Sequence, residues 1–266
     1  MPKTLGFALG AGGARGVAHV GFLKAMEEAG IVPDYLAGSS MGSVIGACYA
    51  AGMTADEMRE ALKSLRAGDV VDLGVRPIRR LGLLKWERAR KFLEAHIAAR
   101  TFEELRIPFC CVAVDIKSGK EATFSSGDLL SAVLASGTIP AVFRPVEREG
   151  GLYVDGGVLC RVPVRQVKAM GADVVVAVDV LGRCRETEKV PHVLSLVARV
   201  YDIMDDARTQ AERRRTRRIT DLWLEPDIPG VSQYEVKYHA SVYDAGYKLG
   251  KENAGKIKAL LGDEGE

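Results

Sequence analysis

The chain has 266 residues, of which 47% are hydrophobic, and its formal net charge is +2. This length and composition are sufficient for a full hydrophobic core in one or two domains. The small net charge argues against a protein that binds nucleic acid through a strongly basic surface. No apolar run approaches the roughly 20 residues that span a bilayer, so we expect a soluble protein.

The five cysteines are an odd number, Cys110 and Cys111 are adjacent, and no CxxC pattern occurs. These features are typical neither of a disulfide framework nor of a zinc site, and they favour a reducing, cytoplasmic setting. No cluster of residues has the spacing of metal ligands, and we expect neither a metal nor another cofactor.

The predicted elements begin with strand, helix, strand and helix, an order typical of parallel strands in an α/β fold. The first apolar stretch runs directly into glycines, so it predicts a strand and not a signal peptide. In chain order we predict a strand at 5–9, a helix at 17–29, a strand at 35–37, helices at 43–51, 54–65 and 83–99, a capped turn at 101–104, strands at 109–115 and 121–125, a helix at 128–136, strands at 143–146 and 152–154, a helix at 164–170, a strand at 174–178, a helix at 193–218, a short strand around Trp223 and a helix at 242–261.

We expect a single domain over residues 1–266, with its motifs between about 5 and 179 and a mostly helical part at 190–266. A polar stretch at 181–191 is the predicted linker. In the helix at 193–218 several apolar residues follow helical spacing, which predicts a face packed in the core, and a lipid-facing lid is the alternative interpretation. These residues are Val193, Leu196, Val197, Val200 and Met204.

A basic cluster ends the same helix, with six arginines at 208 and within 213–218. A solvated surface is the favoured interpretation of this cluster, and contact with an anionic membrane is the alternative.

The sequence GSSMG at 38–42 matches the pattern G-x-S-x-G at a predicted transition from strand to helix. A nucleophile on such a tight turn needs small neighbours, and Gly38 and Gly42 allow strand and helix backbones to approach closely. The spacing selects Ser40, whose oxygen would lie at the helix N-terminus, where free N–H groups favour negative charge.

A second glycine-rich segment, GAGGARG at 10–16, directly follows the first strand. Its exposed N–H groups suit an anion, either a nucleotide phosphate or the oxyanion of an acyl-transfer intermediate. The dinucleotide pattern fails because Arg15 stands where the third glycine belongs, although Asp34 lies near the ribose-binding offset. In a parallel sheet this loop and GSSMG open on the same edge, which favours an oxyanion hole formed by Gly12, Gly13 and Ala14.

A nucleophilic serine needs a base, and none of the four histidines stands in a turn that presents a catalytic side chain. These are His19, His96, His192 and His239. Asp155, which ends a predicted strand and precedes Gly156 and Gly157, is the better candidate. Considered without Ser40, the same residues are typical of a structural hairpin turn.

Taken in order, these blocks resemble the patatin-like phospholipases, in particular small bacterial members. GAGGARG resembles the family's oxyanion loop with its arginine, and GSSMG resembles its nucleophile turn. ASGTIP at 135–140, followed by FRP at 143–145, resembles its A-S-x-x-x-P…F-x-P block. Asp155 with its two glycines, followed by PV at 163–164, resembles its catalytic D-G-G motif. The resemblance covers about residues 5–179. Cys160 and Arg161 depart from it, because the family often has asparagine there.

The resemblance implies a three-layer α/β/α fold with a mainly parallel central sheet and a Ser40–Asp155 dyad that uses no histidine. The implied activity is a lipase or esterase, of phospholipase A or lysophospholipase type, acting on a lipid or fatty-acyl ester without a metal. Arg15 would steady the glycine loop or meet a lipid phosphate. We expect a cytoplasmic protein with transient contact at the inner membrane surface. A nucleotide-binding α/β protein and a catalytically silent regulator with the same fold stay open as alternatives.

Overall fold

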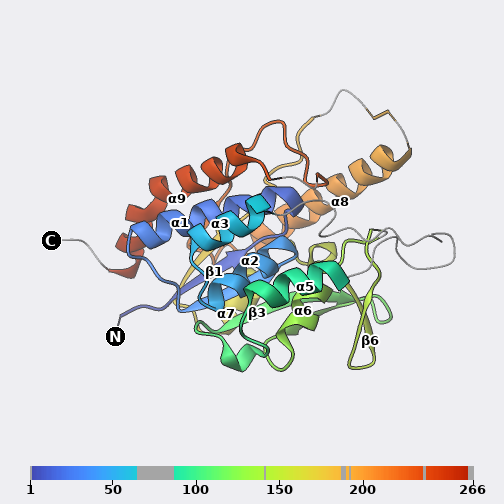
Figure 1. Ribbon diagram of the computed structural model, residues 1–266. Coiled ribbons are helices and arrows are strands. Elements are labelled where there is room, and N and C mark those ends of the chain that lie inside the picture. Colours follow the sequence, from blue (N-terminus) through green and yellow to red (C-terminus); the bar gives the residue numbers. More distant parts are fainter. Residues whose placement is uncertain are drawn as a thin grey trace.

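The computed structural model describes residues 2–64, 87–140, 142–186, 190–191, 193–235 and 238–262 (Figure 1). Its strands are β1 (Leu5–Leu9), β2 (Tyr35–Ser39), β3 (Phe109–Asp115), β4 (Lys120–Phe124), β5 (Val146–Arg148), β6 (Gly151–Asp155), β7 (Val174–Val178) and β8 (Leu222–Leu224). Its α-helices are α1 (Val17–Glu28), α2 (Met41–Ala50), α3 (Ala55–Ser64), α5 (Glu87–His96), α6 (Leu129–Ser136), α7 (Val164–Ala169), α8 (Val193–Thr216) and α9 (Ala240–Leu261). Short 3-10 helices are η1 (Gly13–Gly16), η2 (Phe102–Glu104) and η3 (Gly156–Val158).

The described strands form one mixed sheet in the order β5-β6-β3-β2-β1-β7-β8, and β4 pairs with β3 off this path. From β3 to β8 in this order all neighbours are parallel, whereas β4, β5 and β6 are antiparallel to their partners. The predicted, mainly parallel sheet is confirmed. Because parallel strands end at the same edge, the loops after β1 and β2 open side by side.

Both faces of the sheet are buried, and alternate residues of β1 show how. Leu5, Phe7 and Leu9 point into a large core shared with α1, α2, α6 and α9. Ala8 points the other way, into a smaller core shared with α7. Side chains of a strand alternate between its two faces, so helices cover both sides of the sheet. The predicted three-layer arrangement is therefore confirmed.

Most predicted elements are confirmed with shifts of a few residues at their ends, and the strand at 5–9 coincides with β1. The strand predicted at 143–146 is displaced, because the pairing with β6 begins only at Val146. The described part of the helix predicted at 83–99 is α5, and 83–86 lie outside the described residues.

The prediction that the apolar residues of α8 pack in the core is wrong. Val193 is 74% exposed and Met204 is 67% exposed, and Leu196, Val197 and Val200 are exposed as well. The buried side of the helix instead carries Asp205 and Thr209. Helical spacing identifies an apolar face, but it does not determine which face of the helix meets the protein.

Helix α9, which carries no sequence motif, packs along α1 (Figure 1). The two backbones approach closely at two glycines. A Cβ at Gly246 would lie 1.9 Å from the carbonyl oxygen of Ala18, and a Cβ at Gly21 would lie 2.1 Å from that of Tyr243. Such distances leave no room for a side chain, so this contact depends on glycine at both positions.

We predict that Gly246→Ala destabilises the fold although alanine favours a helix. The methyl group would force α9 away from α1, at a cost of about 1–3 kcal/mol. Gly255→Ala is the matched control, since nothing lies within 4 Å of a Cβ there, and it should stabilise α9 by up to about 1 kcal/mol. Urea unfolding of both variants measures the difference. Equal stability of the two would contradict the close approach.

Candidate active site

Ser40 occupies a strained turn between β2 and α2. Its backbone angles are φ 53° and ψ −124°, a region that non-glycine residues rarely adopt. The surroundings hold this conformation, because the Ser40 N–H donates to Ser136 Oγ at 3.0 Å and its carbonyl accepts from the Ser43 N–H and Oγ. Strain of this kind is typical of a nucleophile turn.

Glycine is required at two positions of this turn, because other backbone segments approach it closely there. A Cβ at Gly38 would lie 2.4 Å from the Cα of Ser43, and a Cβ at Gly42 would lie 2.2 Å from the carbonyl oxygen of Leu9. The clashing atoms are backbone and cannot move aside. The turn therefore packs directly against both α2 and the end of β1.

The strand register brings Asp155 level with this turn. Ser39 pairs with Val112 on β3, and the next residue of β3, Ala113, pairs with Asp155 on β6. The Ser40 side chain and the Asp155 side chain therefore meet at one end of the sheet, although 115 positions separate them in the chain.

The two side chains are hydrogen-bonded. Ser40 Oγ donates to Asp155 Oδ2 at 2.6 Å, and the Gly157 N–H donates to Asp155 Oδ1 at 2.7 Å. The Asp155 N–H is fixed in turn by the carbonyl of Thr138 at 2.8 Å. Ser40 and Asp155 are both buried. The carboxylate thus has one oxygen for the serine hydroxyl and one anchored by the backbone.

Burial raises the pKa of Asp155 to about 6, although the hydrogen bonds from Ser40 and Gly157 lower it and the nearby charge of Asp205 raises it. A carboxylate in water has a pKa near 3.9. At neutral pH the Asp155 side chain is therefore ionised in most molecules, yet it is a stronger base than an exposed aspartate.

The glycine loop (10–16) lies beside the Ser40 turn and the Asp155 loop. A Cβ at Gly16 would meet the Met41 side chain, and a Cβ at Gly157 would lie 3.1 Å from the Cβ of Ala11. Within the loop, the N–H groups of Gly10, Ala11, Ala14 and Arg15 are bonded to carbonyls of Val178, Arg161, Gln233 and Gly12.

These bonds bear on the three residues that we predicted as an oxyanion hole. Ala14 already donates its N–H to Gln233 O at 3.1 Å. Within the described part of the chain, the N–H groups of Gly12 and Gly13 meet no acceptor. Gly13 also has a positive φ of 50°, a conformation that glycine adopts at little cost.

His19 contacts the glycine loop through its side chain. Its side chain is fully buried, with Nε2 2.8 Å from the carbonyl oxygen of Gly10. Burial lowers the pKa of His19 to about 4 although the Gly10 contact raises it, so the ring is neutral at pH 7 and Nε2 carries the shared proton. His239 pairs with Glu235 at the surface, and His192 lies outside the described residues.

At positions 160 and 161, where the chain departs from the resembled motif, the backbone carbonyls accept hydrogen bonds. Cys160 O accepts from Ser39 Oγ at 2.7 Å, and Arg161 O accepts from the Ala11 N–H at 2.8 Å. Backbone groups at these two positions thus join the Asp155 loop to β2 and to the glycine loop.

The side chain of Arg161 forms a buried ion network that the sequence analysis missed. Its guanidinium contacts Asp179 at 2.6 and 3.0 Å and Asp205 of α8 at 2.9 Å. Asp205 also contacts Arg208, which donates to Gly157 O at 2.8 Å. Helix α8 is thereby attached to the loop that carries Asp155. Lone Asp and Arg residues far apart in a sequence give no signal of such a network.

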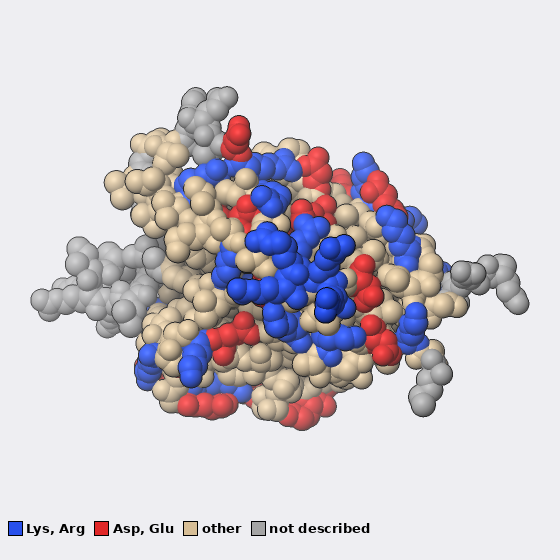
Figure 2. All heavy atoms as spheres, turned by 180° about the vertical axis from the view of Figure 1, so that it is seen from behind, with Lys and Arg blue, Asp and Glu red and all other residues tan. Residues whose placement is uncertain are grey.

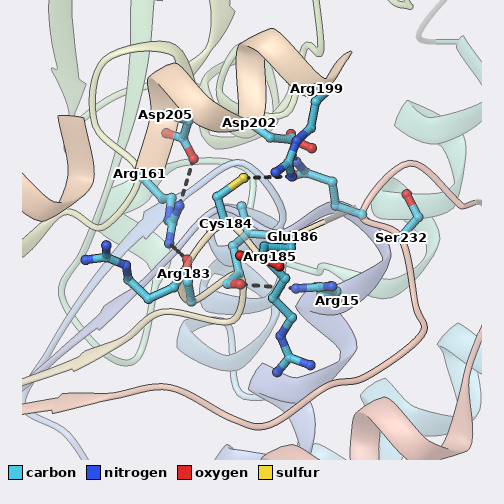
Figure 3. Close-up of a pocket in the computed structure, with 13 residues that line it drawn as sticks. Arg15, Arg161, Arg183, Cys184, Arg185, Glu186, Arg199, Asp202, Asp205 and Ser232 are labelled. Atoms are coloured by element: carbon cyan, nitrogen blue, oxygen red, sulfur yellow. Dashed lines mark hydrogen bonds and ion pairs between the residues drawn. The ribbon is translucent and has the colours of Figure 1, made fainter. Parts of the chain in front are cut away.

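A polar pocket of about 220 Å³ borders this network and Arg15 (Figure 3). Arg15 donates to the carbonyls of Val231 and Leu181 at 2.7 and 3.1 Å, which ties the glycine loop to two other segments. Figure 3 shows Arg161 directed at Asp205 in the wall of this pocket.

The comparison with known families agrees with these motifs. A family model described as patatin-like phospholipase matches residues 7–168, which is more than half of the chain. The chain belongs to the patatin-like phospholipase family.

Several curated proteins are similar to this patatin-like chain. An uncharacterized NTE family protein of Mycobacterium tuberculosis is 38% identical over 66% of this chain and 48% of its own length. Patatin-like phospholipase domain-containing protein 6 of Mus musculus is 30% identical over 94% of this chain and 20% of its length. Lysophospholipase nte1 of Aspergillus fumigatus is 29% identical over 97% of this chain and 18% of its own length. The chain thus spans less than half the length of these relatives.

Solved structures share the patatin-like fold. VipD from Legionella pneumophila aligns with a TM-score of 0.61 and 13% identity, covering 98% of this chain and 67% of that one. The type III effector protein ExoU aligns with a TM-score of 0.50 and 16% identity, covering 98% and 54%.

Among the described residues, no group of His, Cys, Asp and Glu could hold a metal ion. In the same residues no helix combines the length and the apolar character that crossing a bilayer requires.

We predict that Arg161→Leu lowers the free energy of unfolding by about 3–5 kcal/mol, because Asp179 and Asp205 would stay buried without their partner. Arg165→Leu is the matched control. Arg165 pairs with Glu212 but is 57% exposed, and loss of a surface pair costs at most about 1 kcal/mol. Urea unfolding compares the two, and equal costs would show that the buried network does not stabilise the fold.

Proposed function

We propose that this patatin-like chain hydrolyses acyl esters of lipids, with Ser40 as nucleophile and Asp155 as the general base. The observation that carries the proposal is the 2.6 Å hydrogen bond from Ser40 Oγ to Asp155 Oδ2 at a strained, buried turn. A serine hydroxyl bonded to a base of raised pKa is the arrangement that nucleophilic catalysis requires.

In the first half-reaction Ser40 Oγ attacks the ester carbonyl while its proton passes to Asp155 Oδ2. The N–H groups of Gly12 and Gly13 are the proposed donors to the tetrahedral oxyanion, and one such donor is worth about 3–4 kcal/mol. The intermediate collapses, the leaving alcohol takes the proton from Asp155, and an acyl-Ser40 ester remains. Arg15, Gly38, Gly42, Gly156 and Gly157 have supporting roles through the backbone positions that they fix.

In the second half-reaction a water molecule attacks the acyl-Ser40 ester and gives its proton to Asp155. Collapse of this intermediate releases the fatty acid and returns the proton to Ser40 Oγ. Asp155 must be ionised to accept each proton, so turnover should rise with pH and level off above about 6, the pKa of Asp155.

The proposed substrate is a phospholipid or a lysophospholipid. A related protein carries the name lysophospholipase, and both lipids present the same fatty-acyl ester to the dyad. A nucleotide-binding role has less support, since four N–H groups of the glycine loop are already bonded to carbonyls of the protein. A cytoplasmic location with membrane contact is part of the same proposal.

The direct test is covalent labelling by a fluorophosphonate probe, followed by mass spectrometry and by turnover of a water-soluble short-chain ester. We expect the probe to label Ser40, and Ser40→Ala and Asp155→Asn each to lower turnover by about 10³-fold or more. Asn keeps the shape of Asp155 but cannot accept the proton. Ser118→Ala removes an exposed hydroxyl that is bonded to Asp115, so it is the control and should keep the label.

A label on another residue, or near-normal turnover by Asp155→Asn, would refute the dyad. Absence of any label from a folded protein would favour a catalytically silent member of the family.

A further inference from the structure

The first half of α8 reverses the usual arrangement of an amphipathic helix. Between 193 and 204, seven of the described large apolar side chains are exposed. They form the α8 apolar face: Val193, Leu196, Val197, Val200, Tyr201, Ile203 and Met204. At about 100° per residue these positions fall within an arc of roughly 160°. They therefore make one continuous surface.

The orientation of α8 is fixed by its polar side. Asp205 and Thr209 are only 7% and 4% exposed, and Asp205 is held by Arg161 at 2.9 Å. Turning the apolar face inward would take Asp205 away from a buried arginine. A continuous apolar surface on a solvent-exposed helix face is typical of an interaction site.

The helix that carries the α8 apolar face is attached to the loop of the proposed dyad. Arg208, farther along the same helix, donates to Gly157 O at 2.8 Å. Partial burial raises the pKa of Tyr201, and the nearby Asp155 carboxylate raises it further. Tyr201 therefore lies close to Asp155. Ser40 is itself only 6% exposed. An acyl chain must therefore leave water to reach Ser40, and an apolar entrance lowers the cost of that step.

Positive charge flanks the same face. A depression of about 440 Å³ lies between Ile203 of the apolar face and the side chains of Arg183, Arg199 and Arg214. Among the described residues that line this depression, Asp206 is the only carboxylate, and it lies 3.6 Å from Arg183. One guanidinium group can donate two parallel hydrogen bonds to the oxygens of a phosphate.

The C-terminal end of α8 is basic as well. The last turn of α8 carries Arg213, Arg214 and Arg215. On the face of the molecule shown in Figure 2, Lys and Arg side chains gather in a dense central group, and areas with few charged side chains border it.

We propose that the α8 apolar face docks onto a lipid bilayer that contains anionic phospholipid. The apolar side chains enter the acyl region, and Arg183, Arg199 and Arg214 hold headgroup phosphates at its edge. The helix then lies in the plane of the interface. This inference rests on the proposed function, since docking there would bring an acyl ester to Ser40.

The first experiment measures binding without catalysis. In a Ser40→Ala background, Val193→Ser/Val197→Ser is compared with Val32→Ser/Ile116→Ser, which removes two exposed apolar side chains elsewhere. The probe is a vesicle of equal parts phosphatidylcholine and phosphatidylglycerol, and sedimentation gives the partition coefficient. We expect at least about a tenfold loss for the α8 pair and less than about twofold for the control pair. Equal effects would overturn the proposal.

The second experiment restores Ser40 and measures turnover. Both pairs should hydrolyse a soluble short-chain ester at the parental rate, and only the α8 pair should lose hydrolysis of the vesicle lipids. Loss of soluble-ester turnover in the α8 pair would mean that the face serves the fold or the dyad and would overturn docking. If the parent hydrolyses neither substrate, the proposed function fails, while the Ser40→Ala binding data still decide the docking.

The third experiment tests the charges. Arg183→Gln/Arg214→Gln should reduce the preference for phosphatidylglycerol over pure phosphatidylcholine vesicles by about tenfold, and Arg217→Gln/Arg218→Gln should change it far less. An equal loss in both pairs would overturn the headgroup site. Analytical ultracentrifugation tests whether a second copy of the chain covers the α8 apolar face instead. We expect the same oligomeric state for the parent and for Val193→Ser/Val197→Ser. A parental dimer that this pair dissociates would make the face an interface between two copies and would overturn the proposal.

Discussion

The hydrogen bond between Ser40 Oγ and Asp155 Oδ2 is the contact on which the proposed active site depends. Three conditions give it its geometry and its chemistry. The register across β2, β3 and β6 must bring the two residues level, the turn at Ser40 must keep its positive φ, and the carboxylate must stay out of water. The last condition also raises the pKa of Asp155 to about 6. Strand register and the Ser40 turn therefore give the contact its geometry, and burial gives the carboxylate its basicity.

The buried charge of Arg161 links this site to the molecular surface. Asp179 and Asp205 together balance the guanidinium, and Asp205 can do so only if the polar side of α8 faces inward. The apolar side of the helix is then left exposed next to the Asp155 loop. One buried arginine thus accounts both for the attachment of α8 near the proposed catalytic residues and for the apolar surface that we propose as the membrane contact.

Much of the fold could be predicted from the sequence, because strands buried on both faces give strong local signals. The five apolar residues of β1 and of β7 are examples. The meeting of Ser40 and Asp155 came from the resemblance to a family and not from spacing, since no local pattern encodes strand register. The burial of Asp155 could not be predicted either, and this burial decides the direction of its pKa shift. The orientation of α8 was predicted wrongly because it depends on Arg161, which lies more than thirty residues away in the chain. The glycine contacts that hold α9 on α1 likewise have no signal that a single sequence reveals.

The most direct test of the central claim is a ¹³C NMR titration of the Asp155 carboxyl group in the folded protein. We expect a midpoint near pH 6, and a still higher midpoint in Ser40→Ala, because the serine hydrogen bond stabilises the ionised form. A midpoint near 4 that does not respond to the loss of Ser40 would mean that Asp155 is neither buried nor bonded to the serine, and the dyad would have to be abandoned.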